Sequence, residues 1–188
     1  MTLAPVFRSR GVIRSVLFTV SSLGLAVPAA AQSMPEFPLA TDVASPEAIV
    51  AAAYASIQRA PGEDYQWDRF SSLFLPGAQM IPNTEQTGGR KQVLSVDEFV
   101  SRIRNGTTIG GDNDRGFAEE AISSKIERFG DVAHVFSTYQ KHFWQDEQIL
   151  GRGINSFQLV HIDGRWWITG IVWDEESGAG PLPEKYLR

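Results

Sequence analysis

Three polar side chains occur on a face that is expected to be apolar, and of all the residues in the chain they are the best suited to hold a small molecule. Ser156, Gln158 and Thr169 lie within Gly151–Trp173, GRGINSFQLVHIDGRWWITGIVW, among Ile, Val and Trp. Hydroxyl and amide groups on a buried face need hydrogen-bond partners, which side chains, water or a ligand can supply. The pattern predicts a partly apolar pocket with polar anchors, and it assigns no reaction to that pocket.

The register of a predicted β-hairpin brings these three side chains together. Asp163-Gly164 separates two apolar-rich runs and favours a type I′ turn, because both central residues of that turn need positive φ. Residues opposite each other in the hairpin share a face of the sheet. The pairs counted from the turn are Ile162 with Arg165, Val160 with Trp167, Gln158 with Thr169, Ser156 with Ile171, and Ile154 with Trp173.

Aromatic residues elsewhere in the chain would complete the same pocket. Tyr54 can donate a hydrogen bond from its phenol to a ligand carbonyl, or it can pack on the sheet with its hydroxyl bonded to a neighbour. Tyr139 joins the pocket face if the turn at 145–148 has two central residues, whereas a bulge near Gly151 would reverse that face. The predicted ligand-binding residues are Tyr54, Trp67, Tyr139, Ser156, Gln158, Trp167, Thr169 and Trp173.

The histidines and the missing motifs argue against other kinds of site. His134 and His142 are about 26 Å apart along one predicted strand, and His161 lies on another strand. With no cysteine in the chain, this spacing predicts neither a metal site nor a cofactor. The sequence also contains no GxSxG nucleophile motif and no Gly-rich phosphate loop.

The N-terminal segment predicts export from the cytoplasm. Three arginines precede a short apolar run, Val16–Val27, and small residues suited to cleavage follow at Ala29-Ala30-Ala31. The apolar run is shorter than the roughly 20 residues that a membrane span needs. We therefore expect residues 1–31 to be a cleavable signal peptide, and the mature protein to be periplasmic or secreted without a membrane anchor.

Composition narrows the classes of partner. The chain has no cysteine, so neither a disulfide nor a lipid-modified N-terminal cysteine is available. Its formal net charge is −5, and removal of Arg8, Arg10 and Arg14 with the signal would make it more negative. An acidic protein of this kind is not expected to bind nucleic acid or an anionic membrane surface.

The elements that position the candidate residues are expected to run from helices to strands. After an extended linker, residues 32–44, Ser45-Pro46-Glu47 predicts a helix start with serine as N-cap. A second helix is expected over Asp64–Leu73, and Ser95-Val96-Asp97-Glu98 is a capping box that opens a third. The expected strands are Ala78–Ile81, Lys91–Leu94, Phe117–Phe129, Val132–Trp144 and the two of the hairpin. The prediction is one α+β domain, residues 45–188, with three helices against a curved antiparallel sheet of about six strands.

Several motifs carry a resemblance to a known family. They are the inward Tyr of the first helix, LFLPGA after the second, FGDVA at 129–133, GRWWI at 164–168, and Trp173. In this order they resemble the nuclear transport factor 2-like superfamily, which includes ketosteroid isomerases, scytalone dehydratase and polyketide cyclases. The resemblance covers about Ser45–Glu176 and implies a cone-shaped sheet with a cavity at its wide end. It also implies that the face with Trp173 is the inner one, and that homodimers form through the outer face.

Residue by residue, the resemblance carries over only part of the isomerase machinery. It places Tyr54 where the isomerases have a tyrosine that donates to the substrate oxyanion. The isomerase acid is replaced here by Ser156 or Gln158, and the general base by Met80 or Ile81. Proton transfer between carbons needs a base to carry the proton, so these replacements argue against isomerase activity.

The sequence therefore leaves three functions open. The leading prediction is an exported homodimer that binds a small, partly apolar molecule. The first alternative is an isomerase, dehydratase or cyclase acting on a hydrophobic substrate, with His134, His142 or Asp68 as the candidate base. A carboxylate or histidine with a shifted pKa at the pocket centre would favour that enzyme. The second alternative is a non-catalytic dimeric interaction module, in which the face with Ser156 and Gln158 is the outer one.

Overall fold

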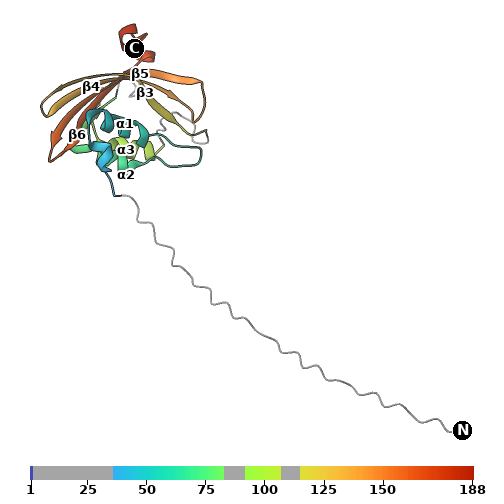
Figure 1. Ribbon diagram of the computed structural model, residues 1–188. Coiled ribbons are helices and arrows are strands. Elements are labelled where there is room, and N and C mark those ends of the chain that lie inside the picture. The colour runs from blue at the N-terminus through green and yellow to red at the C-terminus, as the bar shows by residue number, and fades with distance from the viewer. Residues whose placement is uncertain (2–35, 83–91, 107–114) are drawn as a thin grey trace. The chain divides into compact units, whose positions relative to one another are not determined.

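A strongly curved sheet wraps around helices that lie on its inner side (Figure 1). The computed structural model describes Met1 and residues 36–82, 92–106 and 115–188, so the predicted signal peptide lies almost wholly outside the described residues. Pro35–Arg188 form one compact unit. Its elements are η1 (Ala40–Val43), α1 (Pro46–Ser56), α2 (Trp67–Ser72), β1 (Phe74–Ile81), β2 (Leu94–Ser95), α3 (Val96–Arg104), β3 (Ala118–Phe129), β4 (Val132–His142), β5 (Ile149–Ile162), β6 (Arg165–Glu175), α4 (Glu176–Ala179) and η3 (Glu184–Tyr186).

Capping signals set the starts of two helices. Ser45 is the N-cap of α1, and its Oγ accepts a hydrogen bond from the backbone nitrogen of Ala48 at 3.1 Å. The predicted capping box opens α3, with Ser95 Oγ accepting from Glu98 N and Ser95 N donating to Glu98 Oε2 at 2.8 Å. Each cap satisfies backbone amides that have no partner inside the helix.

The last residues of the predicted linker are packed on the domain. Ala40–Val43 form η1, in which Asp42 and Val43 are buried. Arg69 of α2 donates from Nε and Nη2 to the two carboxylate oxygens of Asp42, each at 2.8 Å. This bidentate pair fixes η1 against α2, since both hydrogen bonds are charge-assisted.

The six strands form one sheet in the order β2-β1-β6-β5-β4-β3. Neighbouring strands are antiparallel except β1 and β6, which are parallel. The core lies between the inner face and the helices, and its most buried side chains include Ile49, Leu73, Phe157, Trp166 and Ile168. The predicted α+β fold, with a curved sheet of about six strands around three helices, is confirmed.

The turn of the predicted hairpin forms as expected. Asp163 and Gly164 have φ values of 54° and 78°, as a type I′ turn requires. From this turn β5 and β6 pair in the predicted register as far as Leu159 and Ile168. The Asp-Gly signal therefore sets the start of the ladder correctly.

A β-bulge then shifts the rest of β6 by one residue. Gln158 pairs with Gly170, which leaves Thr169 as the extra residue of the ladder. Because successive residues of a strand point to opposite faces, one extra residue exchanges the inner and outer faces beyond it. The predicted partners are therefore wrong for three residues of β5, namely Ile154, Ser156 and Gln158, and Trp173 lies opposite Asn155.

No helix within residues 36–82, 92–106 and 115–188 is long and apolar enough to cross a membrane.

Candidate functional site

The bulge divides the predicted ligand-binding residues between the two faces of the sheet. Those on the inner side are Tyr54, Trp67, Tyr139 and Trp173. Those on the outer side or in the bulge are Ser156, Gln158, Trp167 and Thr169. The prediction that the Ser156 and Gln158 side of β5 faces the interior is wrong. That face was inferred from Trp173, which lies beyond the bulge.

Polar side chains do lie on the inner face, but they belong to other residues. Tyr54 Oη donates to Ser137 Oγ at 2.9 Å. Asn155 Nδ2 donates to Tyr54 Oη at 3.1 Å and to Glu119 Oε1 at 3.2 Å. These four residues come from α1, β3, β4 and β5, and all of them are buried. A buried network of this kind costs little stability only when its members are hydrogen-bonded.

Two further side chains of β4 extend the network to β6. Tyr139 Oη donates to Glu175 Oε1 at 3.1 Å, and Lys141 Nζ donates to the same oxygen at 2.5 Å. Lys141 is the direct partner of Glu119 in the β3–β4 ladder, so the two side chains are neighbours on the inner face. We call the whole network the inner cluster; it consists of Tyr54, Glu119, Ser137, Tyr139, Lys141, Asn155 and Glu175.

Two glycines of β5 make room for this connection. Gly151 is the ladder partner of Lys141, and Gly153 is the partner of both Tyr139 and Glu175. A Cβ at Gly153 would lie 2.7 Å from Tyr139 Oη, and a Cβ at Gly151 would lie 2.6 Å from Lys141 Cε. The side chains of Tyr139 and Lys141 therefore cross β5 above the two glycines and reach Glu175.

Burial changes the protonation of the inner cluster. Desolvation raises the pKa of Glu119 to about 7, while the hydrogen bond from Asn155 and the charge of Lys141 oppose this rise and the charge of Glu175 adds to it. Desolvation also raises the pKa of both phenols of the cluster, so each stays neutral and keeps its hydroxyl proton. Glu119 is therefore a buried carboxyl that exchanges its proton near neutral pH.

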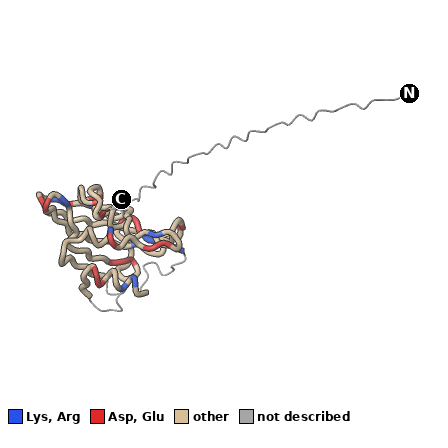
Figure 2. The backbone as a smooth tube through the Cα atoms, turned by 90° about the horizontal axis from the view of Figure 1, so that it is seen from below, with Lys and Arg blue, Asp and Glu red and all other residues tan. Residues whose placement is uncertain are grey.

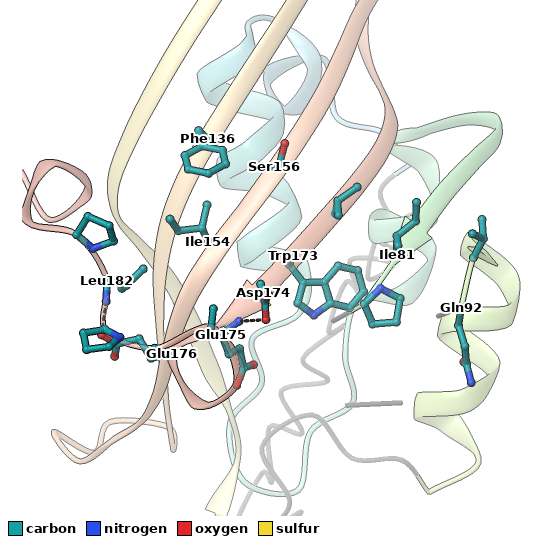
Figure 3. Close-up of a pocket in the computed structure, with 17 residues that line it drawn as sticks. Ile81, Gln92, Phe136, Ile154, Ser156, Trp173, Asp174, Glu175, Glu176 and Leu182 are labelled. Atoms are coloured by element: carbon teal, nitrogen blue, oxygen red, sulfur yellow. Dashed lines mark hydrogen bonds between the residues drawn. The ribbon is translucent and has the colours of Figure 1, made fainter. Parts of the chain in front are cut away.

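A pocket of about 640 Å³ lies on the outer side of the sheet, near the end of β6 (Figure 3). Its middle is formed by Phe136, Ile154 and Ser156, while Ile81 and Gln92 stand on one side and Glu176 and Leu182 on the other (Figure 3). The remaining lining residues are Pro82, Val93, Val172, Trp173, Asp174, Glu175, Ala179, Gly180, Pro181 and Pro183. Most of the lining is apolar.

The C-terminal segment builds one wall of this pocket and is fastened to the outer face. Thr138 Oγ1 donates to the backbone oxygen of Tyr186 at 2.6 Å, and Ser123 Oγ donates to that of Arg188 at 2.6 Å. The ring of Tyr186 packs against Phe136 with 5.0 Å between centroids. Figure 1 shows this segment on the opposite side of the sheet from the helices.

Glu175 joins the pocket to the inner cluster. It lines the pocket, and its Oε1 accepts the hydrogen bonds of Tyr139 and Lys141. Trp173 also lines the pocket, while its ring packs edge-on against Phe99 of α3 with centroids 5.9 Å apart. The pocket together with the inner cluster is therefore the candidate functional site.

The bases suggested by the sequence lie away from the inner cluster. His134 Nε2 is 2.9 Å from Ser156 Oγ on the outer face, His142 lies 3.6 Å from Glu120, and Asp68 is exposed on α2. The carboxyl at the centre is Glu119, which the sequence reasoning missed. Among the described residues, no group of three or more His, Cys, Asp or Glu side chains could hold a metal ion.

Comparison with known proteins identifies the fold. No family model matches the chain, and no curated protein matches it. A solved protein of unknown function with a cystatin-like fold from Nostoc punctiforme is 14% identical, with a TM-score of 0.54 over 69% of this chain and 87% of that one. At this identity the likeness concerns the fold alone, which is cystatin-like.

Two other solved structures carry the name of the family that the sequence resembles. A nuclear transport factor 2-like protein of unknown function from Silicibacter pomeroyi is 18% identical over 69% of this chain and 91% of that one, with a TM-score of 0.46. A nuclear transport factor 2-like protein with a cystatin-like fold from Novosphingobium aromaticivorans is 12% identical over 60% and 71%, with a TM-score of 0.48. The recognition made from the sequence is confirmed at the level of the fold, for which the cystatin-like structure from Nostoc punctiforme is the supporting match.

Proposed function

We propose that this is an exported protein that binds a small, partly apolar molecule in the pocket near the end of β6. The supporting observation is a pocket of about 640 Å³ whose mostly apolar lining meets hydrogen-bonded polar groups at one end. Ligand pockets typically have this size and this mixture of many apolar and few polar groups. Ser156 and Glu175 would anchor the polar part of the ligand, and Phe136, Val172 and Trp173 would enclose its apolar part.

The charges around the pocket favour a neutral or cationic ligand. Asp174, Glu175 and Glu176 line it, and no lysine or arginine is among the described lining residues, although Lys141 pairs with Glu175 and Arg152 with Glu176 from outside the lining. Elsewhere in the unit, basic positions are interspersed with acidic ones rather than gathered on one side (Figure 2). An anionic ligand would lose its hydration next to carboxylates, which is unfavourable. An apolar amine should therefore bind more tightly than a carboxylate with the same skeleton.

Native mass spectrometry of the mature protein, purified from the periplasm, tests the binding proposal directly. A bound small molecule is the expected result, and Val172→Trp should release it by filling the pocket. Val160→Trp is the matched control, because Val160 lies on the same face outside the pocket lining. A protein that carries nothing and takes up neither apolar carbonyl compounds nor apolar amines would contradict the proposal. Finding the protein only in the cytoplasm would contradict its export.

A second candidate function is proton-transfer catalysis on a hydrophobic substrate, of the isomerase, dehydratase or cyclase kind. It is favoured by Glu119, a buried carboxyl whose pKa of about 7 suits a general acid or base at neutral pH. Glu119 would carry the proton for a substrate that reaches the inner face, since neither Glu119 nor Tyr54 is among the residues that line the pocket. Once the ligand is known, Glu119→Gln should abolish its turnover and leave its binding in place. Unchanged turnover in that variant would exclude this function.

The outer face also supports a homodimer. Apolar side chains outside the pocket are exposed on it, with Phe129 and Val132 at 87% and 56% of their full accessibility. Covering such side chains with a second copy would remove apolar surface from water. Sedimentation equilibrium should give a dimer for the mature protein and a monomer for Val132→Glu. A monomer in both would exclude the dimer.

A further inference from the structure

The inner cluster contains a connection across the sheet that apolar packing does not explain. Lys141 on β4 lies beside Glu119 on β3 and reaches Glu175 on β6, two strands away. It passes over Gly151 and Gly153, the positions of β5 where a side chain would block its path or that of Tyr139. Both glycine positions therefore lack a side chain, which leaves space for Lys141 and Tyr139 to reach Glu175.

One lysine stands between two carboxyl groups in this bridge. Lys141 Nζ and Tyr139 Oη both donate to Glu175 Oε1, at 2.5 Å and 3.1 Å. Within the described residues, the Glu119 carboxyl accepts one side-chain hydrogen bond, from Asn155 at 3.2 Å. A buried carboxylate without a paired cation is costly, so the less supported carboxyl is the one that keeps a proton. In this cluster that carboxyl is Glu119.

We propose that Lys141 is a positioning residue that pairs with Glu175 at the pocket and thereby leaves Glu119 to carry the exchangeable proton of the site. This inference deepens the acid–base function and rests on it for its catalytic meaning. When Glu119 ionises, its carboxyl gives its proton to water and becomes a carboxylate, and it takes a proton back from water when it is neutral again. Lys141 and Glu175 remain an ion pair throughout.

The groups around Glu119 come from four elements. The Glu119 carboxyl is faced by the hydroxyl of Tyr54 on α1 and by the amide of Asn155 on β5, whereas Gln58, two residues after α1, donates to its backbone oxygen at 2.9 Å. The charged and titratable neighbours from the sheet are Tyr139 and Lys141 of β4 and Glu175 of β6. Lys141 is the cation of this set, so replacing it by a neutral residue tests how its charge affects Glu119.

A titration of the carboxyls by ¹³C NMR tests the role of Lys141. Protein labelled at the glutamate carboxyl carbon is followed from pH 4 to pH 10, and the Glu119 signal is identified by its absence in Glu119→Gln. In Lys141→Met the Glu119 midpoint should rise by about one unit or more, the size of effect expected for losing a neighbouring positive charge. Lys141→Arg should return it toward the wild-type value. An unchanged midpoint in Lys141→Met would overturn the proposal.

Two controls separate this role from a structural one. Lys125→Met removes a lysine from the exposed part of β3 and should leave the midpoint unchanged. Gly151→Ala keeps the lysine but crowds its Cε, so it should give a smaller rise if Lys141→Met fails to fold. A Gly151→Ala midpoint equal to wild type would then overturn the proposal.

The titration needs neither ligand nor turnover, so its result is independent of the binding proposal. A midpoint that depends on Lys141, in a protein that carries no ligand, supports the positioning role and contradicts the binding function. A bound ligand together with a Glu119 midpoint that does not change in Lys141→Met supports the binding function and contradicts the positioning role.

Discussion

Polar side chains are buried and bonded to other side chains on the inner face of the sheet, and they are reached by water on the outer face. On the inner face, Asn155 and Glu119 are buried and bonded to side chains from other elements. On the outer face, Ser156 is partly exposed beside the pocket and has the ring of His134 as its hydrogen-bond partner. Losing a partner inside leaves a group that water cannot reach, whereas outside water can replace it. Substitutions should therefore cost stability on the inner face and change ligand binding on the outer one.

The largest expected effect is on the inner face, where Glu119 should make the free energy of unfolding depend on pH. Its pKa in the fold, about 7, lies above the ordinary value of 4.5, so the folded state binds more protons than the unfolded state between these values. The free energy of unfolding should therefore fall as pH rises from about 4.5 to 7, by roughly 3 kcal/mol from this group. Urea unfolding at pH 5 and pH 8 measures this loss. Glu119→Gln should lack the contribution, and an equal pH dependence in both proteins would refute it.

A side chain at Gly153 should have the next largest effect. Its Cβ would lie 2.3 Å from the backbone oxygen of Asp174 and 2.7 Å from Tyr139 Oη, so Gly153→Ala should cost about 2 to 3 kcal/mol of unfolding free energy. Gly170→Ala is the control in the neighbouring strand, since its Cβ would meet only Gln79 O, at 3.2 Å. Equal denaturation midpoints for the two variants would contradict the crowding at Gly153.

Two residues of β5 that point to opposite faces allow the stability cost of a substitution on each face to be compared directly. Asn155→Leu removes the donor to both Tyr54 and Glu119 and should cost about 2 kcal/mol, because two buried acceptors lose a partner. Gln158→Leu, on the exposed face of the same strand, should change stability by less than about 0.5 kcal/mol. Thermal unfolding of both variants measures the difference, and similar losses would show that the two faces do not differ in this way.

The smallest stability effect is expected for Ser156→Ala. The hydroxyl lies 2.9 Å from His134 Nε2 at a partly exposed position, so its loss should cost no more than about 0.5 kcal/mol. Isothermal titration with the ligand found by mass spectrometry should nevertheless show weaker binding, because Ser156 lines the pocket. Full affinity in this variant would remove Ser156 from the binding site and leave Glu175 as the polar anchor.

Signals that act within a few residues were read correctly from the sequence. The serine caps of α1 and α3 and the turn at Asp163-Gly164 all form as predicted. Each depends on hydrogen bonds or φ angles of residues that are close in sequence, so the residue types suffice. These signals determined the order of the elements and the α+β class of the fold.

Which face each strand residue occupies could not be read in the same way, because bulges interrupt the β3–β4, β4–β5 and β5–β6 ladders. The ladders slip at Ile122 on β3, Leu150 on β5 and Thr169 on β6. Bulges depend on the curvature and packing of the whole sheet, so the residue types at these three positions do not predict them. Counting from the β3–β4 turn without this bulge would place Glu120 inside in place of Glu119.

The extra residue at Thr169 has an evolutionary consequence. Loss of this one codon would remove the bulge and leave Gly170–Glu175 opposite the same residues of β5, because Gln158 already pairs with Gly170. A lineage can therefore lose this residue while Trp173 and Glu175 stay in the interior. Alignments with distant relatives that lack the bulge need a gap at this position, since an ungapped alignment would pair inward residues of one protein with outward residues of the other.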